Sequence, residues 1–297
     1  MCGIVGLFSK SQAVSEDLGL HLGEMLLQLA DRGPDSAGVA FYRDPAPPGS
    51  SKVSLFSADP RQDWAGVAEA LGAGEPEVRG SHAVLVVEAQ ADEAVRWLHE
   101  RYPELRVMSA GEAIEIYKEA GRPERFVEDF GLASLEGSHA LGHTRMATES
   151  KVTTDGSHPF STGLDLCLVH NGSLSNHNRL REALRAEGID FQTENDSEVA
   201  AGYLTWRLRG GASLEQALEG CLDDLDGFYT FAVGTKEGFA VLRDPIACKP
   251  AVMAETDDWV AMASEYRAIA VLPGAEEAAT WEPEPGRVYS WERTAVV

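Results

Sequence analysis

The residue of this chain best placed to do chemistry is a cysteine at the second position. If Met1 is removed, the thiol of Cys2 and a free α-amino group share one carbon skeleton. An α-amine has a pKa of about 7.7–8.0 and is substantially neutral near neutral pH. It can therefore accept the thiol proton without the help of a histidine. Taken alone, Cys2 is better explained as a residue that merely starts a strand. Whether it is a nucleophile therefore depends on the other motifs of the chain.

Five short motifs follow the opening Met1–Gly6 segment in a fixed order. They are Arg32–Gly38, Gly142–Thr148, His158–Phe160, His170–Gly172 and Asn195–Glu198. The set resembles the class II glutamine amidotransferases, which are N-terminal-nucleophile hydrolases. The resemblance covers residues 1–45 and 138–291, and it is strongest to stand-alone amidotransferase subunits of glutamate-synthase type, such as those of N-methylglutamate synthase. Those subunits share the amino-acid sequence pattern of residues 31–38 and 243–250, although many relatives carry histidine where this chain has Asp31.

The resemblance implies a catalytic role for three residues. Cys2 would attack the side-chain amide of glutamine. Asn171 and Gly172 match the oxyanion pair of the family, in which a side-chain N–H and a backbone N–H face the developing negative charge. Without the resemblance, an Asn-Gly pair is more typical of a type I′ turn.

The resemblance also implies how the amino-acid head of glutamine would be held. Arg145 matches the arginine that binds the substrate α-carboxylate, a task suited to a planar guanidinium. Asp196 matches the carboxylate that binds the substrate ammonium. An aspartate directly before a predicted helix at 197–209 would also be a good N-cap, and both roles are compatible through different oxygens.

Further residues of the motifs are assigned to the surroundings of the substrate. Arg32 is expected to position the loop over glutamine, and Thr148 and His170 are placed with the substrate-binding residues. His143 is expected to support the strand of Arg145. A Cys–His pair through His158 or His170 is the less favoured alternative, because the α-amine already supplies a base.

Composition narrows the class of partner. The 297 residues include 25 Lys+Arg and 48 Asp+Glu, a formal net charge of −23. So acidic a surface repels phosphate backbones and anionic lipids, so we expect neither a nucleic acid nor a membrane as partner. The four cysteines form no CxxC pair, so we predict no metal site and no cofactor. With no signal-like N-terminus and no apolar run of about 20 residues, a cytoplasmic protein is expected.

The elements that must hold these residues can be predicted from hydrophobic spacing. Strands are predicted at 3–9, 37–42, 53–56, 83–88, 105–109, 228–233, 239–243, 252–254, 259–263 and 288–291. Helices are predicted at 18–29, 64–71, 91–101, 177–187, 197–209 and 214–225, the last with a capping box from Ser213 to Gln216. Residues 140–170 are predicted to be turn-rich with only short strands.

The domain organisation is predicted from a change in the pattern of secondary-structure elements near residue 50. A Pro- and Ser-rich linker at 44–51 leads into alternating short strands and helices. We therefore predict an α+β subdomain at 50–130, inserted in an amidotransferase domain spanning 1–297. The resemblance implies an α+β fold, the four-layer α/β/β/α sandwich of N-terminal-nucleophile hydrolases.

The function implied by the resemblance is that of a glutaminase subunit. It would hydrolyse L-glutamine through a thioester on Cys2 and pass ammonia to a separate, flavin-dependent synthase subunit in a hetero-oligomer. Two alternatives remain: a self-contained amidohydrolase acting on another amide, and a catalytically silent regulatory subunit. Arg145 and Asp196, a pair suited to a free amino-acid head, argue against the first. The second is opposed by the complete set of Cys2, Asn171, Gly172, Arg145 and Asp196.

Overall fold

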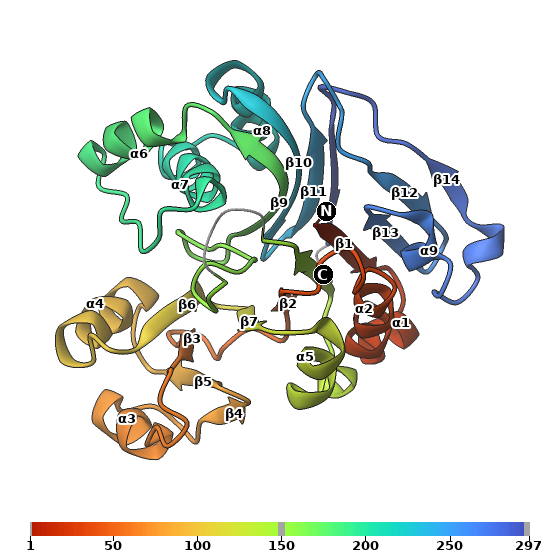
Figure 1. Ribbon diagram of the computed structural model, residues 1–297. Coiled ribbons are helices and arrows are strands. Elements are labelled where there is room, and N and C mark those ends of the chain that lie inside the picture. The colour runs from red at the N-terminus through yellow and green to blue at the C-terminus, as the bar shows by residue number, and fades with distance from the viewer. Residues whose placement is uncertain (1, 148–151, 294–297) are drawn as a thin grey trace.

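Two antiparallel sheets, packed face to face, form the centre of the computed structural model, which describes residues 2–147 and 152–293 (Figure 1). The first sheet has the order β14-β12-β13-β1-β8-β2-β7. Its strands are β1 (Gly3–Ser9), β2 (Ser36–Tyr42), β7 (Ile114–Ala120), β8 (His139–Arg145), β12 (Val252–Glu255), β13 (Trp259–Ala263) and β14 (Ala279–Trp281). The second sheet has the order β15-β11-β10-β9, with β9 (Cys167–Leu174), β10 (Gly227–Thr235), β11 (Gly238–Arg243) and β15 (Val288–Glu292).

Helices cover the outer face of each sheet, which makes four layers. On the seven-stranded sheet lie α1 (Gln12–Glu16), α2 (Leu18–Leu27), α5 (Pro123–Asp129) and α9 (Tyr266–Ile269), with short 3-10 turns at Leu132–Ser134 and Ala275–Glu277. On the four-stranded sheet lie α6 (His177–Ala186), α7 (Asp196–Arg209) and α8 (Leu214–Asp224). The predicted α+β sandwich is therefore confirmed.

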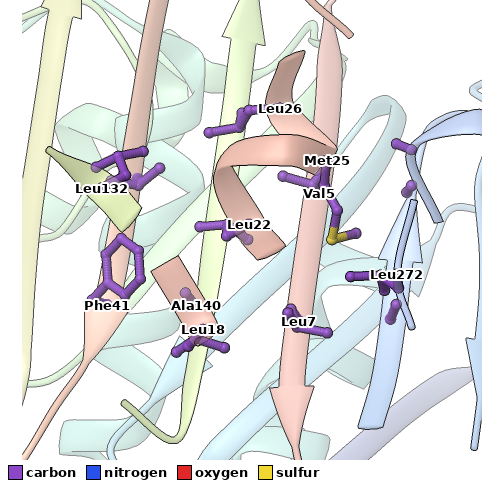
Figure 2. Close-up of a cluster of buried hydrophobic side chains, with 14 of the residues drawn as sticks. Val5, Leu7, Leu18, Leu22, Met25, Leu26, Phe41, Leu132, Ala140 and Leu272 are labelled. Carbon is purple, nitrogen blue, oxygen red and sulfur yellow. The ribbon is translucent and has the colours of Figure 1, made fainter. Parts of the chain in front are cut away.

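The amphipathic face of α2 shows how sequence spacing builds one of these layers. Leu18, Leu22, Met25 and Leu26 are fully buried, and they pack on Val5 and other side chains of the sheet below (Figure 2). Burying a side chain of this size contributes roughly 1.5–3 kcal/mol, so this face alone anchors the helix firmly. The helix in turn covers the strand that leads out of Cys2.

Strand β1 occupies an interior position in its sheet. It pairs antiparallel with β13 on one side, where Val5 lies opposite Ala263, and with β8 on the other, where Gly3 lies opposite Thr144. A Cβ on Gly3 would lie 2.7 Å from Thr144 Oγ1 and 2.9 Å from Leu29 side-chain atoms. Only glycine permits this approach, and the end of β1 is thereby held tightly against α2 and β8.

A third sheet, with the order β4-β5-β3-β6, is separate in its strand pairing and packs against β7 of the sandwich. It comprises β3 (Ser51–Phe56), β4 (Glu77–Arg79), β5 (His82–Val87) and β6 (Arg106–Gly111), covered by α3 (Trp64–Leu71) and α4 (Ala91–Arg101) (Figure 1). The predicted range of 50–130 also takes in β7 and α5. Because β7 pairs with β2 and α5 packs on the main sheet, we propose that the inserted subdomain is limited to 51–111.

Several local predictions are confirmed. The helices at 64–71 and 91–101 have the predicted bounds, and the Ser213–Gln216 capping box is present. Among the described residues of the predicted turn-rich segment at 140–170, only the two ends lie in named strands, β8 up to Arg145 and β9 from Cys167, and β9 then continues to Leu174. Among the described residues, no helix is long and apolar enough to cross a bilayer.

A buried histidine in the subdomain gives the fold a pH dependence. His82 opens β5, is fully buried, and lies between the rings of Phe56 and Phe130 at centroid distances of 5.2 and 5.4 Å. Burial lowers the pKa of His82 to about 3. The unfolded chain takes up this proton near pH 6.5, whereas the folded chain does not, so stability falls as the pH drops below 6.5.

We expect His82→Phe to remove this proton uptake. Between pH 7 and pH 5 the variant should lose roughly 2 kcal/mol less unfolding free energy than the wild type. Urea unfolding at the two pH values measures the difference. His99→Phe, at an exposed position, is the control for the exchange of histidine for phenylalanine itself. A variant whose pH dependence equals that of the wild type would contradict the assignment.

Candidate active site

Cys2 immediately precedes β1, which begins at Gly3. One step beyond the Gly3–Thr144 pair, the antiparallel register sets Cys2 across from Arg145. The thiol is half-buried, and its Sγ lies 3.8 Å from the carbonyl oxygen of Met146. The predicted nucleophile and the predicted carboxylate-binding arginine are therefore neighbours on adjacent strands.

Two side chains hold the backbone of Cys2 from different parts of the fold. Its carbonyl oxygen accepts a hydrogen bond from Arg32 Nε at 3.1 Å and another from Asn171 Nδ2 at 3.3 Å. Arg32 follows α2 and also forms an ion pair with Glu265, whose pKa its hydrogen bond lowers. Asn171 belongs to the other sheet. Residue 2 is thus fixed between both layers.

Asn171 and Gly172 lie inside β9 and not in a turn. They pair with Thr230 and Tyr229 of β10, so the type I′ alternative is excluded. A Cβ on Gly172 would lie 2.0 Å from the carbonyl oxygen of Phe228 and 2.7 Å from His170 Nε2. No side chain fits there.

Arg145 ends β8 and is buried, with a relative exposure of 8%. Its carbonyl oxygen accepts a hydrogen bond from Asp35 N at 3.0 Å, which ties it to the turn after Arg32. A Cβ built on Gly156 would lie 3.7 Å from Arg145 Nη1, so the guanidinium reaches the turn at 153–157. Asn195 Nδ2 donates to Gly156 O at 3.5 Å and links that turn to α7.

Asp196 is the first residue of α7, and the prediction that it caps this helix is wrong. The N-cap is Asn195, whose side chain accepts from Ser197 N at 2.9 Å. Asp196 Oδ2 instead accepts from Leu174 N at 2.9 Å, and its side chain keeps 23% exposure. The carboxylate is therefore held at one oxygen while part of it remains accessible.

Three histidines form a buried array. His143 stacks on His158 at a centroid distance of 4.0 Å, and His143 Nε2 contacts the carbonyl oxygen of His170 at 3.1 Å. Burial lowers the pKa of all three, that of His143 to about 3, so their rings are neutral near pH 7. Within the described residues no hydrogen bond joins any of these rings to the Cys2 thiol. The Cys–His alternative therefore gains no support.

A buried lysine supports the segment that carries His158. Lys118 Nζ donates to the carbonyl oxygens of Asp155, Ser157 and Pro159 at 3.2, 2.9 and 3.2 Å, and lies 4.7 Å from the centroid of the Phe160 ring. Burial lowers its pKa to about 8. Sequence reasoning missed Lys118, as it missed Glu265, because neither belongs to a motif. Ser197 belongs to the motif Asn195–Glu198, but the sequence assigns it no role.

Three further site residues were predicted, namely Arg32, His170 and Thr148. Arg32 lies beside Cys2, as described above. His170 is 3% exposed, and its ring lies against the backbone of Gly172. Thr148 lies outside the described residues. In the described part of the chain, no three His, Cys, Asp or Glu side chains gather into a cluster suited to a metal ion.

This fold is that of known amidotransferases. The glutamine phosphoribosylpyrophosphate amidotransferase of B. subtilis superposes with a TM-score of 0.64 at 21% identity, over 98% of this chain and 47% of the other. A second solved structure, an allosteric regulatory enzyme of purine biosynthesis, gives a TM-score of 0.59 at 20% identity. The chain spans about half the length of these two proteins.

Sequence comparison then defines the family. The chain is 57% identical to the glutamine amidotransferase-like protein GlxB of Rhizobium meliloti (strain 1021), over 98% of both chains. It is 31% identical to a putative glutamine amidotransferase of Methanothermobacter thermautotrophicus, over 97% of this chain and 99% of the relative. The glutamine amidotransferase domain family matches residues 143–271. The chain belongs to the glutamine amidotransferases, and the resemblance predicted from its motifs is confirmed.

Proposed function

We propose that this protein hydrolyses L-glutamine to glutamate and ammonia with Cys2 as an N-terminal nucleophile. The proposal rests on one observation: the carbonyl oxygen of Cys2 accepts hydrogen bonds from both Arg32 and Asn171, and Arg145 lies on the adjacent strand. That arrangement surrounds one thiol with groups of the types needed to attack an amide and to bind an amino acid. Removal of Met1 completes it by freeing the α-amine of Cys2.

The proposed reaction divides into two displacements. The Cys2 amine accepts the thiol proton, and the sulfur attacks the side-chain carbonyl carbon of glutamine. Asn171 Nδ2 and the backbone N–H of Gly172 stabilise the resulting oxyanion, a contact worth roughly 3–4 kcal/mol per donor. The intermediate collapses as the amine returns its proton to the leaving nitrogen, which departs as ammonia. Water then cleaves the thioester, releasing glutamate and restoring the thiol.

The two ends of the amino-acid head would be bound separately. Arg145 would hold the α-carboxylate and Asp196 the α-ammonium, since each carries the charge opposite to that of the group it would bind. Arg32 acts as a positioning residue through its hydrogen bond to the Cys2 carbonyl. Thr148 is kept in the proposed binding set on the strength of its motif alone.

The substitution Arg145→Lys tests the carboxylate role. Lysine keeps the charge but loses the two-pronged donor geometry, so we expect the KM for glutamine to rise about ten-fold or more with a smaller change in kcat. Steady-state kinetics and a melting curve measure the two effects together. Arg61→Lys, a highly exposed position in the subdomain, serves as the control. An unchanged KM in a folded variant would reject the role.

We further propose that the ammonia passes to a separate synthase subunit of glutamate-synthase type in a cytoplasmic hetero-oligomer. Support comes from the similarity of residues 31–38 and 243–250 to stand-alone amidotransferase subunits. The partner would carry the acceptor chemistry and a flavin. Its identity is tested by asking which protein both co-purifies with this chain and raises its rate of glutamine hydrolysis.

Intact mass and a product assay on the purified protein test the proposed activity. We expect the mass of a chain beginning at Cys2, together with equal amounts of glutamate and ammonia from glutamine. A protein that retains Met1 and is inactive even with a partner would favour the silent regulatory alternative. Hydrolysis of other amides but not of glutamine would favour the independent amidohydrolase.

A further inference from the structure

The hydroxyl of Ser197 lies at the junction of the buried histidines and the proposed ammonium site. Ser197 Oγ is 2.9 Å from His158 Nε2, 2.8 Å from His170 Nδ1 and 3.3 Å from Asp196 Oδ1. The residue is only 1% exposed. Three polar groups from a loop, a strand and a helix therefore share one hydroxyl that water does not reach.

The number of available protons determines which group is the donor in each of these three hydrogen bonds. A hydroxyl has one proton to donate and two lone pairs to accept with, while a carboxylate only accepts. The Ser197 proton must therefore point to Asp196 Oδ1, and both histidines must donate to Ser197 Oγ. His158 then carries its proton on Nε2, and His170 carries its proton on Nδ1.

An independent observation agrees with this assignment. The two ring nitrogens left without a proton, His158 Nδ1 and His170 Nε2, are buried and have no hydrogen-bond partner among the described residues. The opposite tautomers would leave buried N–H groups unsatisfied, which proteins avoid. Burial also lowers the pKa of both rings, which keeps each at a single proton near neutral pH.

We propose that Ser197 is a positioning residue that orients Asp196 toward the α-ammonium of the substrate, an inference that rests on the function proposed above. Leu174 N holds Oδ2 of the carboxylate and Ser197 holds Oδ1, so the plane of the group is fixed from both oxygens. The part of the side chain that remains exposed is then available to accept from an ammonium. His158 and His170 act through Ser197 by consuming its two lone pairs, which leaves its proton for Asp196.

The array also connects the two ends of the amino-acid head. His143 lies two residues before Arg145 on β8 and contacts the carbonyl oxygen of His170, which precedes Asn171. His170 in turn contacts Ser197. One continuous set of neutral rings thus joins the strand of the carboxylate site, the oxyanion strand and the helix of the ammonium site.

Ser197→Ala in the full-length protein tests the proposal through ligand selectivity. L-glutamate carries the α-ammonium and glutarate lacks it, so the ratio of their dissociation constants, measured by calorimetry, reports on Asp196 alone. We expect the preference for L-glutamate to fall about ten-fold, and the KM for glutamine to rise with little change in kcat. Ser213→Ala, which removes the cap of α8 outside the site, is the matched control and should lower stability without changing the ratio.

The outcomes are distinguishable. If Ser197→Ala weakens both ligands equally, or neither, the positioning role is overturned. Because binding does not need the thiol, this result stands apart from the proposed function, which fails if the wild type with a free Cys2 does not hydrolyse glutamine. Nitrogen-15 NMR of the wild type gives a test without substitution, decisive if the variant does not fold. Protons on His158 Nε2 and His170 Nδ1 support the assignment, and any other pattern near pH 7 overturns it.

Discussion

Cys2→Ala is expected to lower glutamine hydrolysis by at least roughly 10³-fold, because the variant has no atom to form the thioester. In the assembled complex, synthesis from free ammonia should continue, since the acceptor chemistry is proposed to belong to the partner. Both activities are measured on the same preparation, with glutamine or an ammonium salt as the nitrogen source.

The chain offers a matched control for this substitution. Cys248 is an exposed cysteine, and Cys248→Ala should leave both activities intact. A loss of both glutamine- and ammonia-dependent activity in Cys2→Ala would show that Cys2 serves the structure of the complex. Full glutaminase activity in Cys2→Ala would remove the nucleophile assignment altogether.

Asn171→Ala is expected to lower kcat by roughly 10²–10³-fold, the usual effect of losing one oxyanion donor. The same side chain donates to the Cys2 carbonyl, so its loss also loosens the backbone that carries the sulfur. The KM for glutamine should change much less, because Arg145 and Asp196 remain. Steady-state kinetics with glutamine separate the two parameters.

Asn176→Ala shows what a purely structural asparagine does. Asn176 precedes α6, and its side chain bonds Asp224 O and Asp226 N, away from Cys2. Its loss should lower the melting temperature while kcat stays near the wild-type value. If Asn171→Ala behaves like Asn176→Ala, with lower stability and normal kcat, the oxyanion role is rejected.

Sequence patterns predict the amphipathic helices well and the strands of the site poorly, for a physical reason. Trp64–Leu71 and Ala91–Arg101 bury one face and expose the other, so their apolar spacing reveals them. In β9, Leu168 enters the core below α7 while Cys167 and Val169 enter the core between the sheets. A strand buried on both faces shows no alternation, so its length could not be predicted from spacing.

The candidate site was likewise only partly predictable. The motifs single out Cys2 and Asn171, and the structure brings them together. They do not indicate that Asn195 caps α7, because Asn and Asp are equally good caps and stand side by side. Nor do they reveal Ser197 as a shared partner, because its contacts to His158 and His170 join residues far apart in the sequence.

The interior position of β1 has a consequence for how the protein is made. Its two neighbours, β8 and β13, are translated long after it, and β13 ends only at residue 263. At ordinary synthesis rates the interval from β1 to the end of β13 lasts roughly 10–50 s. Residues 3–9 have no partner strand until β8 has been made, and they lack β13 until the end of the interval. The new N-terminus therefore stays open to processing enzymes for most of translation. Removal of Met1, which the proposed chemistry requires, has this window before the sheet closes around Cys2.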